Sequence, residues 1–294
     1  MNRALVLGGD GFIGGSFACM QKSHNDIQVI SRKKSAYIGN EIVCSDPFNL
    51  KSTFFNDTDI VYNFFGLAHR SDTTNKDLFY KINYDLVVSL AQKAKFAGVK
   101  KFIHMSSISV YGQHEEITKS TPEKPITHYG KSKLLADKAL LELVDDSFKV
   151  LILRPPMIYG IGAPGNMQKL ISLIRILPIL PFKNANEKRS FLCIDNFLIL
   201  LEKAIKLNLE GIQLLCDIKS FSTRELVELI MQGTGTKKRL INLPFKSAIK
   251  TFLPTYYRKL FGSLTVESNL SWDGVANYKD PSQILIEMAQ KATF

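Results

Sequence analysis

The sequence is poor in the features that mark several classes of protein. Among 294 residues it has one tryptophan and four cysteines, which lie far apart. This spacing excludes zinc and thiol-redox motifs, which need closely spaced cysteine pairs. We therefore expect the four cysteines to be small residues of the core. The longest nearly apolar run, 170–182, contains one arginine and two prolines and is shorter than the roughly 20 residues of a bilayer span. The N-terminus lacks the uninterrupted apolar stretch of a signal peptide, so we expect a cytoplasmic protein.

The charge of the chain is strongly positive. Its formal net charge is +11, which suits an anionic ligand such as a nucleotide, although a solvated surface explains excess lysine equally well. Segment 237–261 holds seven basic residues and no acidic one. We favour a solvated helix face there; the alternatives are the lining of a diphosphate site and contact with anionic lipid. No nucleic-acid recognition module accompanies the charge, so we expect no nucleic-acid binding.

Short β-branched runs alternate with helical patterns in the first half of the chain. Strands are expected at 4–7, 27–31, 41–44, 59–65, 101–107 and 149–154, with amphipathic helices at 77–97 and 129–143. This alternation predicts an α/β fold with a Rossmann-type doubly wound parallel sheet. A loop rich in proline and glycine follows Arg154 and marks a domain transition.

The less regular second half predicts a smaller C-terminal substrate-binding domain. We expect a helix at 167–177, a strand at 191–194, a helix from Asp195, a strand at 212–216 and a helix from Thr223. The expected division gives residues 1–165 to the nucleotide-binding domain, with 186–210 returning to it. The second domain then comprises 166–185 and 211–294.

The first strand runs directly into a glycine-rich turn, GGDGFIG. Gly8 and Gly11 permit a tight turn whose N–H groups approach a pyrophosphate at a helix N-terminus, and Gly14 permits close packing of that helix on the strand. Phe12 and Ile13, within the same turn, are further candidate cofactor contacts. A glycine turn without a ligand is the alternative.

The residues after the second strand bear on the choice of cofactor. An NAD enzyme usually has an acidic residue there, whereas this chain has Ser31, Arg32 and Lys33. A hydroxyl followed by two cations matches the 2′-phosphate of NADP(H) better, so NADP(H) is favoured over NAD(H). A basic loop without such a role is the alternative.

Four other residues are candidate cofactor contacts because of their positions near strand ends. Asp46 is placed to accept a hydrogen bond from adenine, or else to cap the following helix. Phe64 and Gly66 follow the fourth expected strand, and Pro156 follows the strand at 149–154. The missing side chain at Gly66 permits a close approach.

Ser107, Tyr129 and Lys133 form the candidate catalytic set. Ser107 ends the expected strand at 101–107, while Tyr129 and Lys133 lie one helical turn apart. A lysine ammonium on the same helix face favours the tyrosine phenolate. These groups predict proton transfer by Tyr129, hydrogen bonding to the reacting oxygen by Ser107, and a supporting role for Lys133 that includes the nicotinamide ribose.

These motifs, together with FFGLAHR, MSSISVYG, YGKSK, LRPPMIYG and NEKRSF, resemble the extended short-chain dehydrogenase/reductase family of nucleotide-sugar epimerases and reductases. The resemblance implies an NAD(P)-dependent enzyme, the catalytic triad named above, and a homodimer. It also implies that Asn83 lies near the site and that Arg189, helped by Lys188, holds the substrate diphosphate. Many family members have an asparagine near the bound nucleotide where this chain has Met157, and we expect Asn166 to supply the amide instead. Ser109 is the other expected substrate contact.

The resemblance includes reductases of 4-keto nucleotide sugars, of the UDP-N-acetyl-hexosamine type found in bacterial surface-polysaccharide biosynthesis. Ser31, Arg32 and Lys33 favour this NADPH-dependent reduction as the reaction of the chain. An NAD(P)-dependent UDP-sugar 4-epimerase is the alternative. Dehydration is disfavoured because Ile108 and Ser109 stand where dehydratases carry an Asp–Glu pair. A non-catalytic dinucleotide-binding module ranks lower still, because the tyrosine and the lysine are both present.

Overall fold

The computed structural model describes residues 3–21, 27–35, 41–68, 76–244, 246–253, 257–258, 261–275 and 277–292. At residues 246, 248 and 249 it describes the backbone alone. The chain forms two compact units, which we describe separately. The first comprises residues 1–113, 122–154 and 204–213, and the second comprises 114–121, 155–203 and 214–294.

The first unit is built on a seven-stranded sheet with the order β12-β7-β5-β4-β1-β2-β3. Its strands are β1 (Ala4–Leu7), β2 (Ile27–Ser31), β3 (Glu41–Val43), β4 (Ile60–Asn63), β5 (Lys101–Met105), β7 (Lys149–Arg154) and β12 (Gly211–Leu214). Its helices are α1 (Phe12–Met20), α2 (Lys76–Tyr80), α3 (Leu86–Phe96) and α4 (His128–Glu142). Short helical turns are η1 (Pro47–Asn49), η2 (Ser52–Phe55), η3 (Lys81–Asp85) and η4 (Ile108–Tyr111).

The strand order places the candidate site at one edge of this sheet. β1 pairs in parallel with both β2 and β4, so the order of the strands reverses at β1. Ligands of doubly wound sheets bind outside the carboxyl ends of the strands at such a reversal. The glycine turn follows β1 and the Phe64–Gly66 segment follows β4, so both lie at the carboxyl ends.

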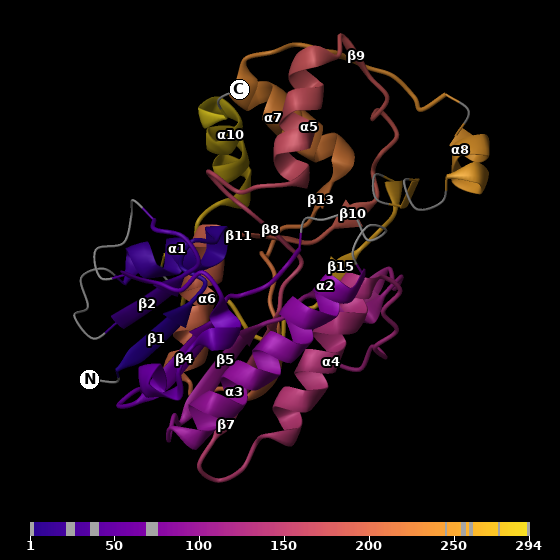
Figure 1. Ribbon diagram of the computed structural model, residues 1–294. Helices are drawn as coiled ribbons and strands as arrows, with labels where there is room; N and C mark the ends of the chain where they lie inside the picture. The colour runs from indigo at the N-terminus through magenta and orange to yellow at the C-terminus, as the bar shows by residue number, and fades with distance from the viewer. Residues whose placement is uncertain are drawn as a thin grey trace. The chain divides into compact units, whose positions relative to one another are not determined.

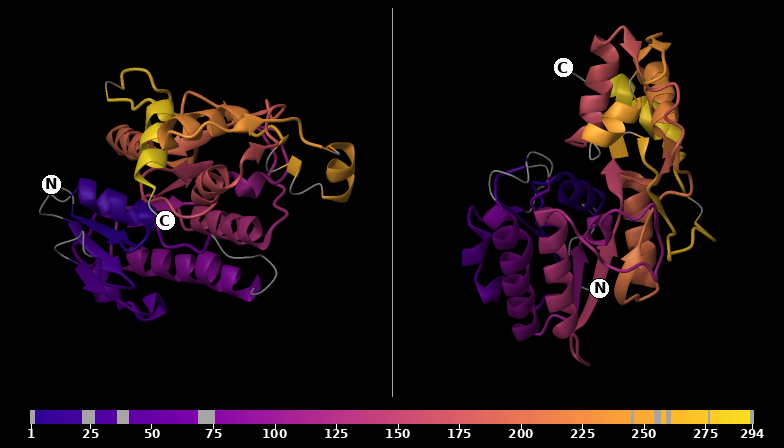
Figure 2. Two further views of the ribbon diagram at one scale, coloured as in Figure 1. Left: turned by 90° about the horizontal axis from the view of Figure 1, so that it is seen from above. Right: turned by 90° about the vertical axis from the view of Figure 1, so that its right-hand side faces the viewer.

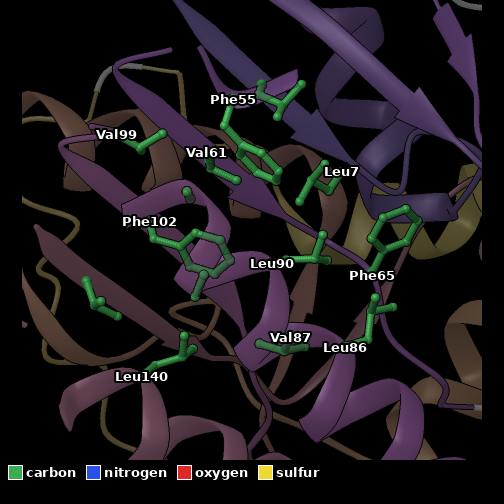
Figure 3. Packing of buried hydrophobic residues seen from close by; sticks show 14 of the residues in the cluster. Leu7, Phe55, Val61, Phe65, Leu86, Val87, Leu90, Val99, Phe102 and Leu140 are labelled. Carbon is green, nitrogen blue, oxygen red and sulfur yellow. The ribbon is translucent and has the colours of Figure 1, made fainter. Parts of the chain in front are cut away.

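The core of the first unit lies between the sheet and its helices. Strands β1, β5 and β7 are almost wholly buried, as expected for a parallel sheet that is covered on both faces. Figure 3 shows Leu86, Val87 and Leu90 of α3 packed within this core, which also contains Val61 and Phe102 of the strands. α3 and α4 lie side by side in Figures 1 and 2.

The helix expected at 77–97 is continuous but is not regular throughout. Between α2 and α3, residues Lys81–Asp85 widen into the π-helical turn η3, which contains Asn83. Such turns are frequent at functional sites. The helix ends at Gly98, whose φ of 84° is left-handed, and the Val99 N–H donates to the Ala94 carbonyl at 3.0 Å. This is the glycine-terminated helix end that the sequence predicts.

In the described residues of the second unit there are four two-stranded pairs and several helices. The pairs are β8 (Met157–Tyr159) with β11 (Phe191–Cys193), β10 (Lys188–Arg189) with β13 (Phe221–Ser222), β9 (Ile179–Leu180) with β14 (Arg239–Leu240), and β6 (Glu116–Ile117) with β15 (Thr265–Val266). The helices are α5 (Asn166–Ile176), α7 (Thr223–Thr234), α8 (Lys246–Phe252) and α10 (Pro281–Lys291). α6 (Ile194–Lys206) begins in this unit and ends in the first.

The observed division differs from the expected one at three places. Residues 155–165 belong to the second unit because β8 pairs with β11 and not with the large sheet. The segment that returns to the first unit is 204–213, because β12 joins the large sheet beside β7. Residues 114–121 leave the first unit because β6 pairs with β15.

Two other expectations concern cysteines and membrane spans. Cys193 and Cys216 are buried as expected, but Cys19 is exposed because it lies on the outer face of α1. Within the described ranges, no helix is both long enough and apolar enough to cross a membrane.

Candidate active site

The glycine turn is shaped by close backbone contacts that exclude side chains. The N–H groups of Gly8 and Gly9 donate to the Ile30 carbonyl at 2.8 and 3.2 Å, which ties the turn to the end of β2. Gly8 has a φ of 92°, and a Cβ on Gly14 would overlap the Gly8 carbonyl oxygen. These contacts agree with the packing role expected of Gly14 and with the tight turn expected at Gly8.

This turn fits the pyrophosphate of a dinucleotide. Gly11 precedes α1, and the N–H groups of Phe12 and Ile13 open the helix, where no earlier helical carbonyl can accept from them. The first turn of α1 has no acidic side chain, and the carboxylate of Asp10, two residues before it, is paired with Arg32. Backbone N–H groups and the helix dipole therefore favour a phosphate at this position.

Arg32, on which the expected preference for NADP rests, has a partner. The Arg32 N–H donates to Asp10 Oδ1 at 3.2 Å, and Arg32 Nη2 lies 3.4 Å from Asp10 Oδ2. Ser31 is buried, while Lys33 is exposed. The glycine motif by itself gives no role to the side chain of Asp10, the residue between Gly9 and Gly11.

The other expected cofactor contacts differ in their surroundings. Asp46 caps η1 by accepting the Phe48 N–H at 3.2 Å, which is the alternative role considered for it. The Phe64 backbone lies against Gly8, where a Cβ would come within 3.1 Å of it. Pro156 is buried in the second unit. Adenine binding by Asp46 and cofactor contact by Pro156 remain predictions.

Ser107 and Tyr129 are brought together by η4 and α4. Ser107 precedes η4; its Oγ accepts the Ser109 N–H at 3.1 Å and is hydrogen-bonded to the Tyr129 side chain. Thr127 caps α4 by accepting the Gly130 N–H at 3.0 Å. A Cβ on Gly130 would come within 2.5 Å of the Ser109 carbonyl oxygen, so glycine permits α4 to approach η4 this closely.

Lys133 lies one turn further along α4 and is buried. Its Nζ donates to the Met105 carbonyl at 2.7 Å, and a Cβ on Gly66 would come within 3.2 Å of the same atom. The missing side chain at Gly66 thus makes room for the Lys133 ammonium group, whereas the sequence alone suggested that it makes room for a cofactor. Burial lowers the pKa of Lys133 to about 8, and the Asp137 charge opposes that shift.

The pKa of the Tyr129 phenol is raised above its usual value. Burial is the main cause, while the hydrogen bond from Ser107 acts in the opposite direction and the Asp137 charge adds to the increase. Because the pKa of Lys133 is about 8, most of its side chains carry a proton at pH 7. The arrangement therefore supplies a hydroxyl, a phenol and a nearby cation at the carboxyl end of β5, which is a set suited to proton transfer at an alcohol or ketone.

A buried group of charges, which no sequence motif identified, begins one turn beyond Lys133 on α4. Asp137, one turn beyond Lys133 on α4, accepts from Ser106 Oγ at 2.8 Å and from Arg154 Nε at 2.9 Å. Arg154 also donates to the Tyr111 hydroxyl at 2.7 Å and lies 2.8 Å from Glu123. The sequence contains a signal for Asp137, because Tyr129, Lys133 and Asp137 are each four residues apart and residues four apart share a helix face.

His104 borders this group as a neutral side chain. Asn63 Oδ1 accepts the Phe65 N–H, so its Nδ2 faces His104 Nδ1 at 3.2 Å as a donor. The histidine proton therefore resides on Nε2, which lies 3.9 Å from Asp137 Oδ1. Burial, helped by the Lys133 charge, lowers the pKa of His104 well below its usual value.

The side chain of Asn83 holds the loop after β4. Its Oδ1 accepts the Leu67 N–H at 2.7 Å, and its Nδ2 donates to the Leu67 carbonyl at 3.0 Å and to Ser132 Oγ at 3.2 Å. The side chain is fully buried, so these contacts favour support of the loop after β4 over the direct substrate contact that was expected. Ser109, in contrast, is partly exposed beside Ser107.

The expected substrate residues of the second unit also have partners. Arg189 Nη1 donates to the Arg258 and Gly262 carbonyls at 3.1 and 3.0 Å, while Lys188 forms an ion pair with Glu225 at 2.6 Å. Lys188 is therefore already neutralised, and Arg189 holds the turn that carries Arg258. Asn166 is exposed at the first residue of α5.

The second unit has a pocket beside this turn. It has a volume of about 500 Å³ and is lined by Glu115, Glu187, Lys250, Tyr257, Arg258, Phe261, Gly262 and Ser263. Burial lowers the pKa of the Arg189 guanidinium, but its usual value is so high that the charge remains. Lys250, Arg258 and the Tyr257 hydroxyl can bind an anionic group, whereas Glu115 and Glu187 add negative charge to the same lining.

Known proteins resemble this chain over most of its length. UDP-glucose 4-epimerase of Vibrio cholerae is 29% identical over 287 residues, covering 90% of this chain and 83% of that protein. N-acetyl-alpha-D-glucosaminyl-diphospho-ditrans,octacis-undecaprenol 4-epimerase of Escherichia coli O157:H7 is 25% identical over 183 residues, covering 60% of this chain and 55% of that protein.

A solved structure shares the fold over nearly the whole chain. The crystal structure of UDP-glucuronic acid 4-epimerase from Bacillus cereus in complex with NAD aligns with a TM-score of 0.76 at 17% identity, covering 98% of this chain and 97% of that one. The family model for the NAD dependent epimerase/dehydratase family matches residues 4–210. Because this match spans more than half of the chain, the protein belongs to the NAD dependent epimerase/dehydratase family.

Proposed function

We propose that the protein is an NAD-dependent 4-epimerase of a UDP-sugar. The observation that carries the proposal is the similarity to UDP-glucose 4-epimerase of Vibrio cholerae, which extends over 90% of the chain. The site agrees with it, because Ser107, Tyr129 and Lys133 lie at the carboxyl edge of the sheet, where a dinucleotide binds in doubly wound folds. This proposal takes up the alternative of the sequence analysis in place of its main hypothesis, a reductase.

An epimerase oxidises sugar C4 to a ketone and then reduces it again, and the same catalytic residues serve both half-reactions. NAD, held by the glycine turn, would supply hydride acceptor and hydride donor chemistry at sugar C4. Tyr129 Oη takes the proton of the C4 hydroxyl as the ketone forms and gives it back when the hydride returns. Ser107 Oγ hydrogen-bonds the same sugar oxygen, and the Lys133 ammonium stabilises the phenolate.

The cofactor turn and the second unit have binding roles in this proposal. The N–H groups at the start of α1 hold the pyrophosphate of the dinucleotide. Asn166, Arg189 and the pocket beside Arg258 bind the nucleotide diphosphate of the sugar. Ser109, next to Ser107, contacts the sugar ring.

The reductase hypothesis differs from the epimerase proposal in whether the dinucleotide is consumed. A reductase consumes one dinucleotide for each turnover, whereas an epimerase regenerates its own. The residues Ser31–Lys33 were the reason to favour NADPH and a reductase, but Arg32 is paired with Asp10. The epimerase therefore has the better support.

The test incubates the protein with NAD⁺ and, separately, with UDP-glucose and UDP-N-acetylglucosamine, and follows the anomeric proton signals by NMR and absorbance at 340 nm. We expect the C4 epimer to form without net change in absorbance. Net oxidation of NADPH with a 4-keto-6-deoxy UDP-sugar, and no epimer from either UDP-sugar, would establish a reductase instead.

Two expected partners remain predictions. A homodimer is checked by sedimentation velocity. Contact of segment 237–261 with anionic lipid is consistent with Phe252 and Leu253, which are exposed at the end of α8, and is checked by co-sedimentation with phosphatidylglycerol vesicles against phosphatidylcholine vesicles.

A further inference from the structure

The end of β2 lacks a carboxylate of its own. Between Asp26 and Glu41 the chain has no acidic residue, and Arg32, Lys33 and Lys34 follow the strand directly. In doubly wound dinucleotide-binding folds, this position faces the adenosine ribose. An acidic residue there binds the 2′-hydroxyl of NAD, whereas a cation binds the 2′-phosphate of NADP.

The structure supplies a carboxylate to this position from a different segment. The hydrogen bonds from Gly8 and Gly9 to Ile30 hold the glycine turn against the end of β2. Asp10 is the next residue of that turn, and both its oxygens face Arg32. The side chain of Asp10 is 14% exposed and that of Arg32 is 55% exposed, so the carboxylate is the more enclosed partner.

The pair changes what each side chain offers to a ligand. The guanidinium is neutralised by a carboxylate 3.4 Å away, so a 2′-phosphate would have to compete with Asp10 for it. The same carboxylate repels a phosphate and accepts a hydrogen bond from a hydroxyl. Within residues 31–35 and 41–44, which the structure describes, the other charged groups are Lys33 and Lys34, which are exposed, and Glu41, whose Oε2 accepts the Ser35 N–H at 2.7 Å.

We propose that Asp10 determines the choice of dinucleotide. Its carboxylate takes the place of the missing acidic residue of β2, accepts a hydrogen bond from the adenosine ribose of NAD, and withholds Arg32 from the 2′-phosphate of NADP. The inference rests on dinucleotide binding by the proposed function, and it replaces the preference for NADP(H) that the sequence suggests.

The test measures binding of NAD⁺ and NADP⁺ by isothermal titration calorimetry without any sugar. The wild-type protein should bind NAD⁺ more tightly than NADP⁺ by roughly tenfold or more, as expected for one hydrogen bond to a charged group. Asp10→Asn should reduce this ratio by about tenfold or more, because it weakens the bond to the ribose and releases Arg32. Adding Arg32→Ala to Asp10→Asn should remove the gain in NADP⁺ binding.

Asp57→Asn is the matched control. Asp57 forms an exposed ion pair with Arg3 at 3.5 Å in the same unit, and asparagine tolerates its φ of 58°. The ratio of affinities should stay unchanged. Equal or tighter binding of NADP⁺ by the wild type, the same ratio in Asp10→Asn, or no binding of either dinucleotide would overturn the inference. Normal selectivity without epimerisation would leave it intact and contradict the proposed function alone.

Discussion

At the scale of single residues, proton transfer depends on the Tyr129 hydroxyl. Tyr129→Phe removes that oxygen and leaves the ring, which packs against Phe79 with centroids 6.3 Å apart. We expect kcat to fall by about 10²–10⁴-fold, while the affinity for NAD⁺, measured by calorimetry, changes little. Tyr80→Phe is the control, because its hydroxyl bonds His128 and has no proposed role in the reaction. Unchanged turnover in Tyr129→Phe would contradict the assignment.

The charge of Lys133 predicts how activity depends on pH. Since its pKa is about 8 and its charge stabilises the phenolate, kcat should fall as the pH rises above about 8. In the unfolded chain the lysine keeps its proton up to about 10.5. Between these two values, loss of the proton removes the cost of burying the charge, so the free energy of unfolding rises with pH. The loss of activity should therefore occur without loss of fold, as circular dichroism at each pH will show.

A charge-neutral variant of Asp137 tests what sets the pKa of Lys133. The Asp137 charge raises the pKa of Lys133, so Asp137→Asn should move the alkaline decline of kcat to lower pH. Glu142→Gln removes an equal charge from the exposed face of the same helix and should leave the decline in place. If the two variants give the same pH profile, Asp137 does not act on Lys133. Melting temperatures distinguish this effect from unfolding of Asp137→Asn.

At the scale of elements, the contact of α4 with η4 brings Ser107 to Tyr129. Gly130→Ala places a methyl group within 2.5 Å of the Ser109 carbonyl oxygen, so the two elements must separate. We expect a loss of about 1–3 kcal/mol in the free energy of unfolding, measured in urea, and a fall in kcat. Lys131→Ala, one residue along on the exposed face, should change stability by about 0.5 kcal/mol or less. Full activity in Gly130→Ala would show that this approach is not required.

The π-helical turn shows the limit of periodic patterns at this scale. The sequence predicts a helix over 77–97, and the structure has one at 76–96 with the irregular turn at 81–85. The apolar spacing of α3 is enough to locate the helix. Asn83 of this turn binds both backbone groups of Leu67, which is sixteen residues away, and helical periodicity does not reveal such a contact.

At the scale of the whole molecule, buried charges join elements that are distant in sequence. Asp137 on α4 and Arg154 at the end of β7 are both fully buried. Arg154→Met leaves the carboxylate without its cation, so the free energy of unfolding should fall by about 3–5 kcal/mol in urea titrations. Arg224→Met removes an exposed pair with Glu228 and should cost about 0–1 kcal/mol. Equal losses in the two variants would contradict this difference.

The domain arrangement was predictable in outline and not in its boundaries. Alternating strands and helices predict the large sheet, and six of its strands start and end within two residues of the expected limits. Strand β12 was also expected, but it was assigned to the other domain. Its neighbour in the sheet, β7, lies about sixty residues earlier, and a strand pattern does not identify its partner.

The amino-acid sequence by itself determined the α/β class, the glycine turn at the end of β1 and the presence of Ser107, Tyr129 and Lys133, because these depend on local periodicity and on spacings within one turn. The tertiary structure alone decided that Asp10 engages Arg32, that Gly66 makes room for Lys133, and that Asp137 lies between Lys133 and Arg154. The physical reason is that charge pairing and close packing depend on distances across the sheet and its loops, and those distances exist only after the chain has folded.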